Sequence, residues 1–351
     1  MTDLNRHATW REIQAQPAIW RDWGRQIDIA GLRQWVAGQA VDEVWFCGAG
    51  SSAYIGEIVV AALEGGKTRC RAVPTTDLVS RPAAYLTGRR PLVVSFGRSG
   101  NSAETLGTLD ALDALAPDAP RLNITCNAQS ALARRTSTNT RALILPDATH
   151  DAAFAMTSSF STMLLTALAI FGDDFGGLEP VSEALMPLLP LFETHALAAR
   201  LPERVVFLGA GPLTFAAREA ALKAMELSAG QVPALWDSTL GFRHGPKSFV
   251  TPGTDVFVFL TADAQAARYD ADLVAELRAQ FPASCVTTIG PGGDIDIPTD
   301  GMNLILPVVF AQVLAVIWSD RLSLNVDDPF AGRGTLSRVV AGIRLYPAVS
   351  A

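Results

Sequence analysis

The charged residues best suited to proton transfer lie in one short segment. Glu219, Lys223 and Glu226 are four and three residues apart, so in a helix two carboxylates flank one ammonium on a single face. This pattern is more often a solvated stripe of ion pairs. A chemical role is favoured because lysine is scarce, with three lysines beside 25 arginines, and Lys247 lies in the nearby segment GFRHGPKS.

Two loops rich in glycine and serine are candidate anion sites. The first, residues 48–52, follows an apolar run and precedes AYIGEIVVAAL, which has a helical pattern. Glycines allow a sharp turn, and a helix N-terminus offers free N–H groups and positive partial charge. We therefore consider Gly50, Ser51 and Ser52 as anion ligands. A simple strand-to-helix turn is an equal alternative, and Ala53 breaks the GxGxxG pattern of dinucleotide sites.

The second loop, residues 95–102 with the sequence SFGRSGNS, gives a stronger signal. Hydroxyls, backbone amides and one guanidinium together suit a bound phosphate. The candidate ligands are Arg98, Ser99, Asn101 and Ser102. Capping of the next helix by Ser99 or Ser102 is the alternative, but it does not explain the whole run.

The elements that must position these residues follow a repeat. VWFCGAG at 44–50 recurs as VVFLGAG at 205–211, and LILP at 143–146 recurs at 304–307, both 161 residues later. Short apolar runs alternate with helical stretches in each half, which is typical of a parallel sheet covered on both faces. The sequence predicts an α/β protein with two tandem copies of one doubly wound fold, and ligands at the carboxyl ends of the strands.

Domain boundaries follow from this repeat. We expect an N-terminal helical arm at residues 1–30, a first domain with the anion loops at 31–195, and a second domain with the Glu/Lys helix at 196–351. The best connecting segment is residues 178–201, which contain three prolines. The apolar residues 302–318 are expected to form a short buried strand, LILP, and then a buried helix rather than a membrane span.

Composition excludes several classes of protein. With 49% hydrophobic and 18% charged residues the chain is globular, and a net charge of −7 argues against a nucleic-acid partner. Cys47, Cys70, Cys126 and Cys285 form no CxxC pair or Cys/His cluster, so we expect buried free thiols and no metal. The polar N-terminus lacks a signal peptide, so a cytoplasmic protein is expected.

A family resemblance rests on several motifs in order along the chain. They are GAGSS, SFGRSGNSAET, THDAAFAMTSSFS at 149–161, and REAALKAMELSAG with GFRHGPKS. With these motifs the chain resembles the sugar isomerase (SIS) domain superfamily. In detail it resembles the bacterial tagatose-6-phosphate ketose/aldose isomerases, whose members act as galactosamine-6-phosphate deaminase/isomerases. It is more distantly similar to the isomerase half of glucosamine-6-phosphate synthase.

The resemblance implies roles for the charged segment. Glu226 falls at the position of the carboxylate that carries a proton between C1 and C2. Lys223 and Glu219 fall at substrate-contacting positions. His244 falls at the position of the histidine that opens the sugar ring, although a turn histidine before Gly-Pro is the plain alternative.

The resemblance also implies phosphate ligands. Ser52, Arg98, Ser99 and Ser102 match the phosphate-binding positions, with Thr157 and Ser158 close by.

Two departures from the family pattern matter. Gly97 replaces a serine of the cradle, a loss that a bidentate contact from Arg98 would offset. Arg338 stands where the synthase has an imine-forming lysine, so an orienting role is expected there instead.

The reaction expected from the resemblance removes an amino group, because the chain leaves no room for a glutaminase domain. Galactosamine 6-phosphate would give tagatose 6-phosphate and ammonia, with no organic cofactor. Glucosamine 6-phosphate deamination and isomerisation of a sugar phosphate without an amino group use the same proton shuttle and remain alternatives. A non-catalytic sugar-phosphate sensor is a further alternative, but it would not need Glu226 or His244. We expect a homo-oligomer in which the GFRHGPKS loop reaches a neighbouring active site.

Overall fold

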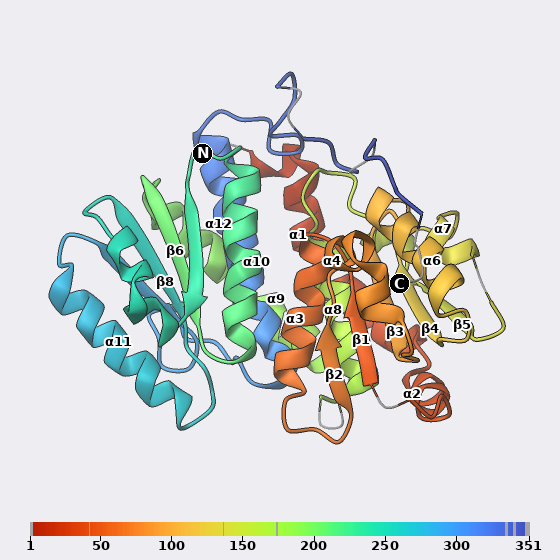
Figure 1. Cartoon of the computed structure of the whole chain (residues 1–351). Helices are drawn as coiled ribbons and strands as arrows, with labels where there is room; N and C mark the ends of the chain where they lie inside the picture. Colours follow the sequence, from red (N-terminus) through yellow and green to blue (C-terminus); the bar gives the residue numbers. More distant parts are fainter. Residues whose placement is uncertain are drawn as a thin grey trace. The chain divides into compact units, whose positions relative to one another are not determined.

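The computed structural model describes residues 3–41, 43–135, 137–172, 175–333, 336–339 and 342–347. The chain forms two compact units, each built around one parallel sheet (Figure 1). The five-stranded unit consists of Ala18–Asp151, Ser158–Leu178 and Leu336–Ala351. The four-stranded unit consists of Met1–Pro17, Ala152–Thr157 and Glu179–Thr335. The predicted α/β class with two parallel sheets is confirmed.

The five-stranded sheet has the strand order β2-β1-β3-β4-β5, with every neighbouring pair parallel. Its strands are β1 (Glu43–Cys47), β2 (Arg69–Ala72), β3 (Leu92–Gly97), β4 (Arg121–Thr125) and β5 (Thr140–Ile144). The central strands β3 and β4 are buried along their whole length, as expected for a sheet covered on both faces. The carboxyl ends of β1 and β3 lie side by side, with Cys47 paired to Ser95.

Helices cover both faces of this sheet. Its helices are α2 (Ile29–Ala37), α3 (Ser51–Ala62), α4 (Thr75–Ser80), α5 (Pro82–Leu86), α6 (Ala103–Leu115), α7 (Ala131–Arg134) and α8 (Ser158–Phe171). Trp45 and Val93 pack with residues of α4, α5 and α6 on one face. Phe46 points to the other face, where it meets Phe171 at the end of α8 and lies close to Gly56 of α3.

The four-stranded sheet has the order β7-β6-β8-β9 and is likewise parallel. Its strands are β6 (Arg204–Gly209), β7 (Ala234–Ser238), β8 (Thr254–Phe259) and β9 (Cys285–Ile289). The helices of this unit are α9 (Glu179–Ala198), α10 (Pro212–Leu227), α11 (Ala266–Gln280) and α12 (Leu306–Arg321). The remaining helix, α1 (Ala8–Gln26), crosses the division between the two units.

The two faces of the four-stranded sheet carry different helices (Figure 1). Phe257 contacts Phe310 and Trp318 of α12, and Trp236 on the same face contacts α10. The alternate residues Val206, Leu208, Val256 and Val258 point the other way and pack against α11. The helices α10 and α11 therefore lie on opposite faces of one sheet.

The first half of the predicted repeat is confirmed by the backbone. The turns after β1 and β6 both have a glycine at the N-cap of the following helix, Gly50 with φ 56° and Gly211 with φ 56°. This left-handed conformation suits glycine, which lacks a Cβ atom. The same strand–glycine–helix turn is thus used twice.

The second half of the repeat, LILP, was predicted wrongly. The first LILP runs from β5, but the second lies in a 3₁₀ turn (Gly301–Ile305) that leads into α12. A fifth strand is therefore not formed from it. The predicted buried helix that follows is confirmed. Gly301–Arg321 is long and apolar enough to span a membrane, but 89% of its most apolar stretch is buried inside the protein.

The predicted domain ranges also differ from the observed units. Residues 178–201, expected to be the connection, form α9 with Pro187 and Pro190 inside it. Its buried residues Val181, Leu185 and Leu189 recur every four positions, so burial of an apolar face outweighs the prolines. Near the predicted boundary at residue 195 the chain passes between the units at Leu178 and Glu179 instead. It also crosses at 17–18, 151–152, 157–158 and 335–336, so the C-terminal residues predicted to lie in the second domain belong to the five-stranded unit.

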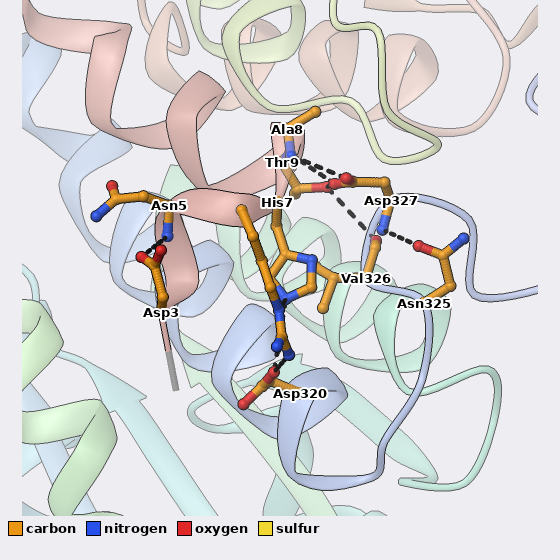
Figure 2. A network of polar contacts seen from close by, with 10 residues as sticks. Asp3, Asn5, His7, Ala8, Thr9, Asp320, Asn325, Val326 and Asp327 are labelled. Atoms are coloured by element: carbon orange, nitrogen blue, oxygen red, sulfur yellow. Dashed lines mark hydrogen bonds and ion pairs between the residues drawn. The ribbon is translucent and has the colours of Figure 1, made fainter. Parts of the chain in front are cut away.

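The start of α1 is held by a carboxylate from the end of the four-stranded unit. Asp327 accepts hydrogen bonds from the backbone N–H groups of Ala8 (2.9 Å) and Thr9 (2.8 Å) and from the Thr9 hydroxyl (2.9 Å) (Figure 2). Burial alone would raise the pKa of Asp327, but these hydrogen bonds outweigh it and hold the pKa below its ordinary value. Asp327 thus acts as a cap supplied from a distant part of the chain.

Replacing this cap tests its contribution to stability. We expect Asp327→Ala to lower the free energy of unfolding by about 1 kcal/mol near neutral pH, as for loss of a helix N-cap. Because the folded-state pKa is lowered, this stability is present above the ordinary pKa of aspartate and is lost as the pH falls through the folded-state value. Urea unfolding at several pH values measures it, with the exposed Asp328→Ala as control. An equal loss in both variants would contradict the capping role.

Candidate functional site

Helix α10 brings the three predicted charged residues together. The Lys223 Nζ lies 3.3 Å from Oε1 of Glu219 and 2.5 Å from Oε2 of Glu226. Lys223 and Glu219 are buried, with side chains 1% and 0% exposed, whereas the Glu226 side chain is 22% exposed. The alternative of a solvated ion-pair stripe does not fit this burial. We call Glu219, Lys223 and Glu226 the α10 triad.

The α10 triad keeps a positive charge in the interior of the four-stranded unit. Burial alone would lower the pKa of Lys223, but the carboxylates of Glu219 and Glu226 outweigh it and hold the pKa above its ordinary value. Lys223 is therefore a fixed cation and not a base near neutral pH. Glu226 is the member of the triad that a ligand can reach, and its carboxylate lies against this cation.

His244 lies in a different part of the same unit. It ends a 3₁₀ turn (Gly241–His244) that follows β7, and its side chain is exposed. Within the described residues, no hydrogen bond or ion pair joins His244 to the α10 triad. The loop packs through Phe242 and Val250 on the sheet face covered by α11, which is the face opposite α10. One chain therefore does not place His244 on the side of the sheet that carries Glu226.

The two predicted anion loops meet at one edge of the five-stranded sheet. Gly50 precedes α3, where Ser51 and Ser52 are buried in the first turn, and the loop after β3 leads into α6. Ser102 caps α6, accepting from the N–H of Thr105 (3.3 Å). The capping alternative is thus correct for Ser102 without excluding a ligand, since parallel strands end at this same edge.

Two other residues of the second loop have internal roles. The Ser99 hydroxyl accepts from the N–H of Asn101 (3.3 Å), and the Asn101 Oδ1 accepts from the N–H of Ala131 (2.8 Å). Asn101 thereby holds the first residue of α7, so its predicted role as an anion ligand lacks support from its side-chain oxygen.

Arginines gather beside this edge. Arg98 is 6% exposed and donates to the backbone carbonyl of Arg338 (3.0 Å), and Arg338 donates to the backbone carbonyl of Asp151. Guanidinium groups from two distant segments therefore lie close to the glycine- and serine-rich loops. The arrangement favours a doubly charged anion such as a phosphate ester.

Asp151 and His150 were missed by the sequence analysis. The Asp151 carboxylate accepts from the N–H groups of Ser158 (2.9 Å) and Ser159 (3.1 Å) and from the Ser159 hydroxyl, so it caps α8. The amide of Ser158, predicted to lie near phosphate, is satisfied internally, and Thr157 is buried just before this helix. The spacing of Asp151 before Ser158 and Ser159 was the only sequence signal for this cap.

His150 belongs to the same electropositive region. Burial lowers its pKa, and the guanidinium groups of Arg338 and Arg98 lower it further, more than Asp151 and Asp147 raise it. The cations of Arg98 and Arg338 therefore affect His150 more strongly than the carboxylates of Asp151 and Asp147 do. This supports an anion site near β1 and β3.

Cysteines and metal ligands give no further site in the described part of the chain. No group of three or more His, Cys, Asp or Glu side chains is placed to hold a metal ion among the described residues. The four thiols are free, and burial raises the pKa of Cys47 and Cys126 to about 12, so both stay protonated. Cys70 is half-buried and Cys285 is exposed, so the prediction of buried thiols was wrong for these two.

Comparison with known proteins agrees with the family resemblance. A model described as the SIS domain matches residues 40–171. The chain is 38% identical over 374 residues to a Shewanella sp. (strain ANA-3) protein named D-galactosamine-6-phosphate deaminase AgaS, covering 99% of this chain and 94% of the relative. It is 38% identical over 371 residues to an Escherichia coli protein of the same name, covering 97% and 96%.

A solved structure is similar over the same length. The crystal structure of tagatose-6-phosphate ketose/aldose isomerase from Escherichia coli matches with a TM-score of 0.87 and 32% identity, covering 99% of this chain and 98% of that chain. The two-unit architecture is therefore shared with an experimentally determined structure.

The burial of the α10 triad gives a stability test. We expect Lys223→Met to lower the free energy of unfolding by about 3 kcal/mol, because it leaves Glu219 buried without its cation. The double variant Glu219→Gln/Lys223→Met is expected to recover most of this loss. Arg278→Gln, which breaks an ion pair with both partners about half exposed, is the control, with an expected cost below about 1 kcal/mol. Chemical denaturation measures all four proteins, and similar losses for Lys223→Met and Arg278→Gln would contradict the buried pairing.

Proposed function

Because the chain belongs to the family of SIS-domain proteins that includes the D-galactosamine-6-phosphate deaminases AgaS, we propose that it converts galactosamine 6-phosphate to tagatose 6-phosphate and ammonia. The observation that carries this proposal is the α10 triad, in which an accessible carboxylate lies against a buried ammonium. Such a pair suits a base that must remove and return one proton at neighbouring carbons.

The proposed reaction begins with ring opening. His244 donates a proton to O5 as the bond between O5 and C1 breaks. The C1 hydroxyl loses its proton to water in the same step, which leaves an open-chain aldehyde. Glu226 then removes the proton from C2, the electron pair moves onto O1, and O1 takes up a proton from water to give an enolamine. The same carboxylate returns a proton to C1. The product of this transfer is an iminium at C2, and water adds to it to release ammonia and leave the ketose.

Lys223 supports the base in this scheme without exchanging protons itself. The Lys223 Nζ donates a hydrogen bond to Oε2 of Glu226 (2.5 Å), which holds this carboxylate in one orientation for the C2 proton. Glu219 balances the charge of Lys223 on its other side. We therefore assign Lys223 and Glu219 a supporting role in positioning Glu226.

The phosphate of the substrate is assigned to the five-stranded unit. The donors are the backbone amides of Gly50 and Ser51, the hydroxyls of Ser99 and Ser102, and the guanidinium of Arg98, whereas the Ser52 amide donates to the carbonyl of Ala49. The supporting observations are the meeting of both loops at one sheet edge and the electropositive surroundings of Arg98 and Arg338. Arg338 orients this region, since arginine stays protonated and forms no imine.

A second activity is supported by the solved structure that bears the name tagatose-6-phosphate ketose/aldose isomerase. Isomerisation uses the same ring opening and the same transfer between C2 and C1, with a hydroxyl in place of the amine at C2. Ammonia release separates the two activities directly.

Assaying ammonia release tests the proposed function. We expect the wild type to release ammonia from galactosamine 6-phosphate, and Glu226→Gln and His244→Asn to lose roughly a hundredfold or more in kcat, as for loss of a general acid or base. Glucosamine 6-phosphate is assayed in parallel to define the preference at C4. No ammonia from either sugar, with conversion of tagatose 6-phosphate, would favour the isomerase.

We also propose a homo-oligomer in which His244 serves the site of a neighbouring subunit. Support comes from the position of the His244 loop and α10 on opposite faces of one sheet. Co-expression of Glu226→Gln and His244→Asn chains is then expected to restore about a quarter of the wild-type activity in the whole dimer population, because about half of the dimers are mixed and one of the two sites in each mixed dimer is intact. Activity no higher than that of either variant alone would contradict shared sites.

A further inference from the structure

The loop that carries His244 is fixed at its start by a buried carboxyl group. Asp270 of α11 is fully buried and accepts from the Thr239 hydroxyl (2.7 Å) and from the N–H of Thr261 (3.0 Å). Burial raises the pKa of Asp270, more than these hydrogen bonds lower it. Burial of a carboxyl group costs free energy unless the group is hydrogen-bonded. The two hydrogen bonds of Asp270 offset this cost and join α11 to the ends of β7 and β8.

The turn after Thr239 is also constrained. The Ser238 hydroxyl accepts from the N–H of Gly241 (3.0 Å), and a Cβ atom at Gly241 would lie 2.5 Å from that hydroxyl oxygen. The backbone that leads to His244 therefore follows one tight path. Phe242 and Val250 then anchor the loop in the apolar cluster under α11.

A second carboxylate of α11 holds the loop on both sides of His244. Glu276 forms ion pairs with Arg243 (2.9 Å to Oε2) and with Lys247 through Oε1. Arg243 directly precedes His244, and Lys247 follows it by three residues. One carboxylate thus bridges both flanks of an exposed imidazole. The hydrogen bond from Lys247 and the charges of both cations lower the pKa of Glu276, so it stays ionised near neutral pH.

Among the residues that the structure describes, the side chains that flank His244 are held by ion pairs, but the His244 imidazole is not. In the described residues, the flanking side chains are paired with α11, whereas no hydrogen bond or ion pair is made by the imidazole of His244 itself. Arg243 is exposed, and an ion pair with an exposed partner contributes little to stability. A loop that presents an acid to a substrate must hold it in place, because a displacement of the acid by about 1 Å strongly lowers the reaction rate.

We propose that Glu276 is a positioning residue for His244, and that α11 holds the Arg243–Lys247 loop so that the imidazole is presented for ring opening. This inference rests on the proposed function, and it adds a residue on another helix to the ring-opening step. Glu276 acts through Arg243 and Lys247 and does not touch the substrate.

The test separates ring opening from proton transfer. Ring opening alone is measured as the enzyme-catalysed interconversion of the α and β anomers of galactosamine 6-phosphate, by exchange NMR, with all proteins carrying Glu226→Gln. In this background we expect Glu276→Gln to slow the interconversion by about tenfold, less than the roughly hundredfold or greater loss in His244→Asn. With Glu226 intact, kcat for ammonia release falls to a similar extent and KM is unchanged.

Arg278→Gln is the matched control. Arg278 lies on the same helix, and its ion pair with Asp294 (2.8 Å) is exposed and points to a different loop. We expect anomer interconversion and kcat in this variant to equal those of the parent protein. Equal losses in Glu276→Gln and Arg278→Gln would overturn the proposal, as would an unchanged rate of interconversion in Glu276→Gln.

Hydrogen exchange decides the inference if the wild type proves inactive. We expect backbone amides of residues 239–250 to exchange faster in Glu276→Gln than in the wild type, and not in Arg278→Gln. Unchanged exchange in this loop would overturn the positioning role. Absence of activity in the wild type, with faster loop exchange in Glu276→Gln, would reject the proposed function and retain the hold of α11 on the loop.

Discussion

A lysine whose side chain is 1% exposed must have its charge balanced at close range, and this requirement shapes the four-stranded unit. Lys223 meets it with carboxylates one turn before and one turn after it on α10. The helix must then be held against β6, β7 and α12, because a shift would expose or separate the pair. Gly211 makes this placement possible by turning the chain sharply from β6 into α10. This packing leaves the carboxylate of Glu226 accessible while Lys223 beside it stays buried.

The same strand–glycine–helix turn has diverged in the two units. After β1 it leaves Gly50, Ser51 and Ser52 at a helix start beside a second polar loop, which suits an anion. After β6 it leads to a longer helix that carries the α10 triad. The residue 161 positions before Lys223 is Ala62, where α3 ends, so the first copy has neither the charge nor the helix length. Specialisation therefore occurred at opposite ends of equivalent helices.

Much of this arrangement could be predicted from sequence, because it depends on local pattern. Apolar runs identified the central strands, and the spacing of Glu219, Lys223 and Glu226 placed them on one helix face. The edge strands β2 and β7 were missed, since RCRA and ALWDS are only partly apolar. The second LILP was assigned to a strand although its environment makes it helical, because four apolar residues do not determine a conformation.

Contacts between distant segments were beyond local pattern. The Arg338 guanidinium meets the carbonyl of Asp151, and Glu276 meets the loop of His244, only because the fold brings them together. The central claim, that the Glu226 carboxylate moves a proton from C2 to C1, is tested most directly by turnover of galactosamine 6-phosphate in D₂O. The partly exposed Glu226 should exchange with solvent, so NMR should find deuterium at C1 of the ketose phosphate. Deuterium incorporation at C1 that is undiminished in Glu226→Gln would contradict the claim, because this carboxylate would then not carry the proton to C1.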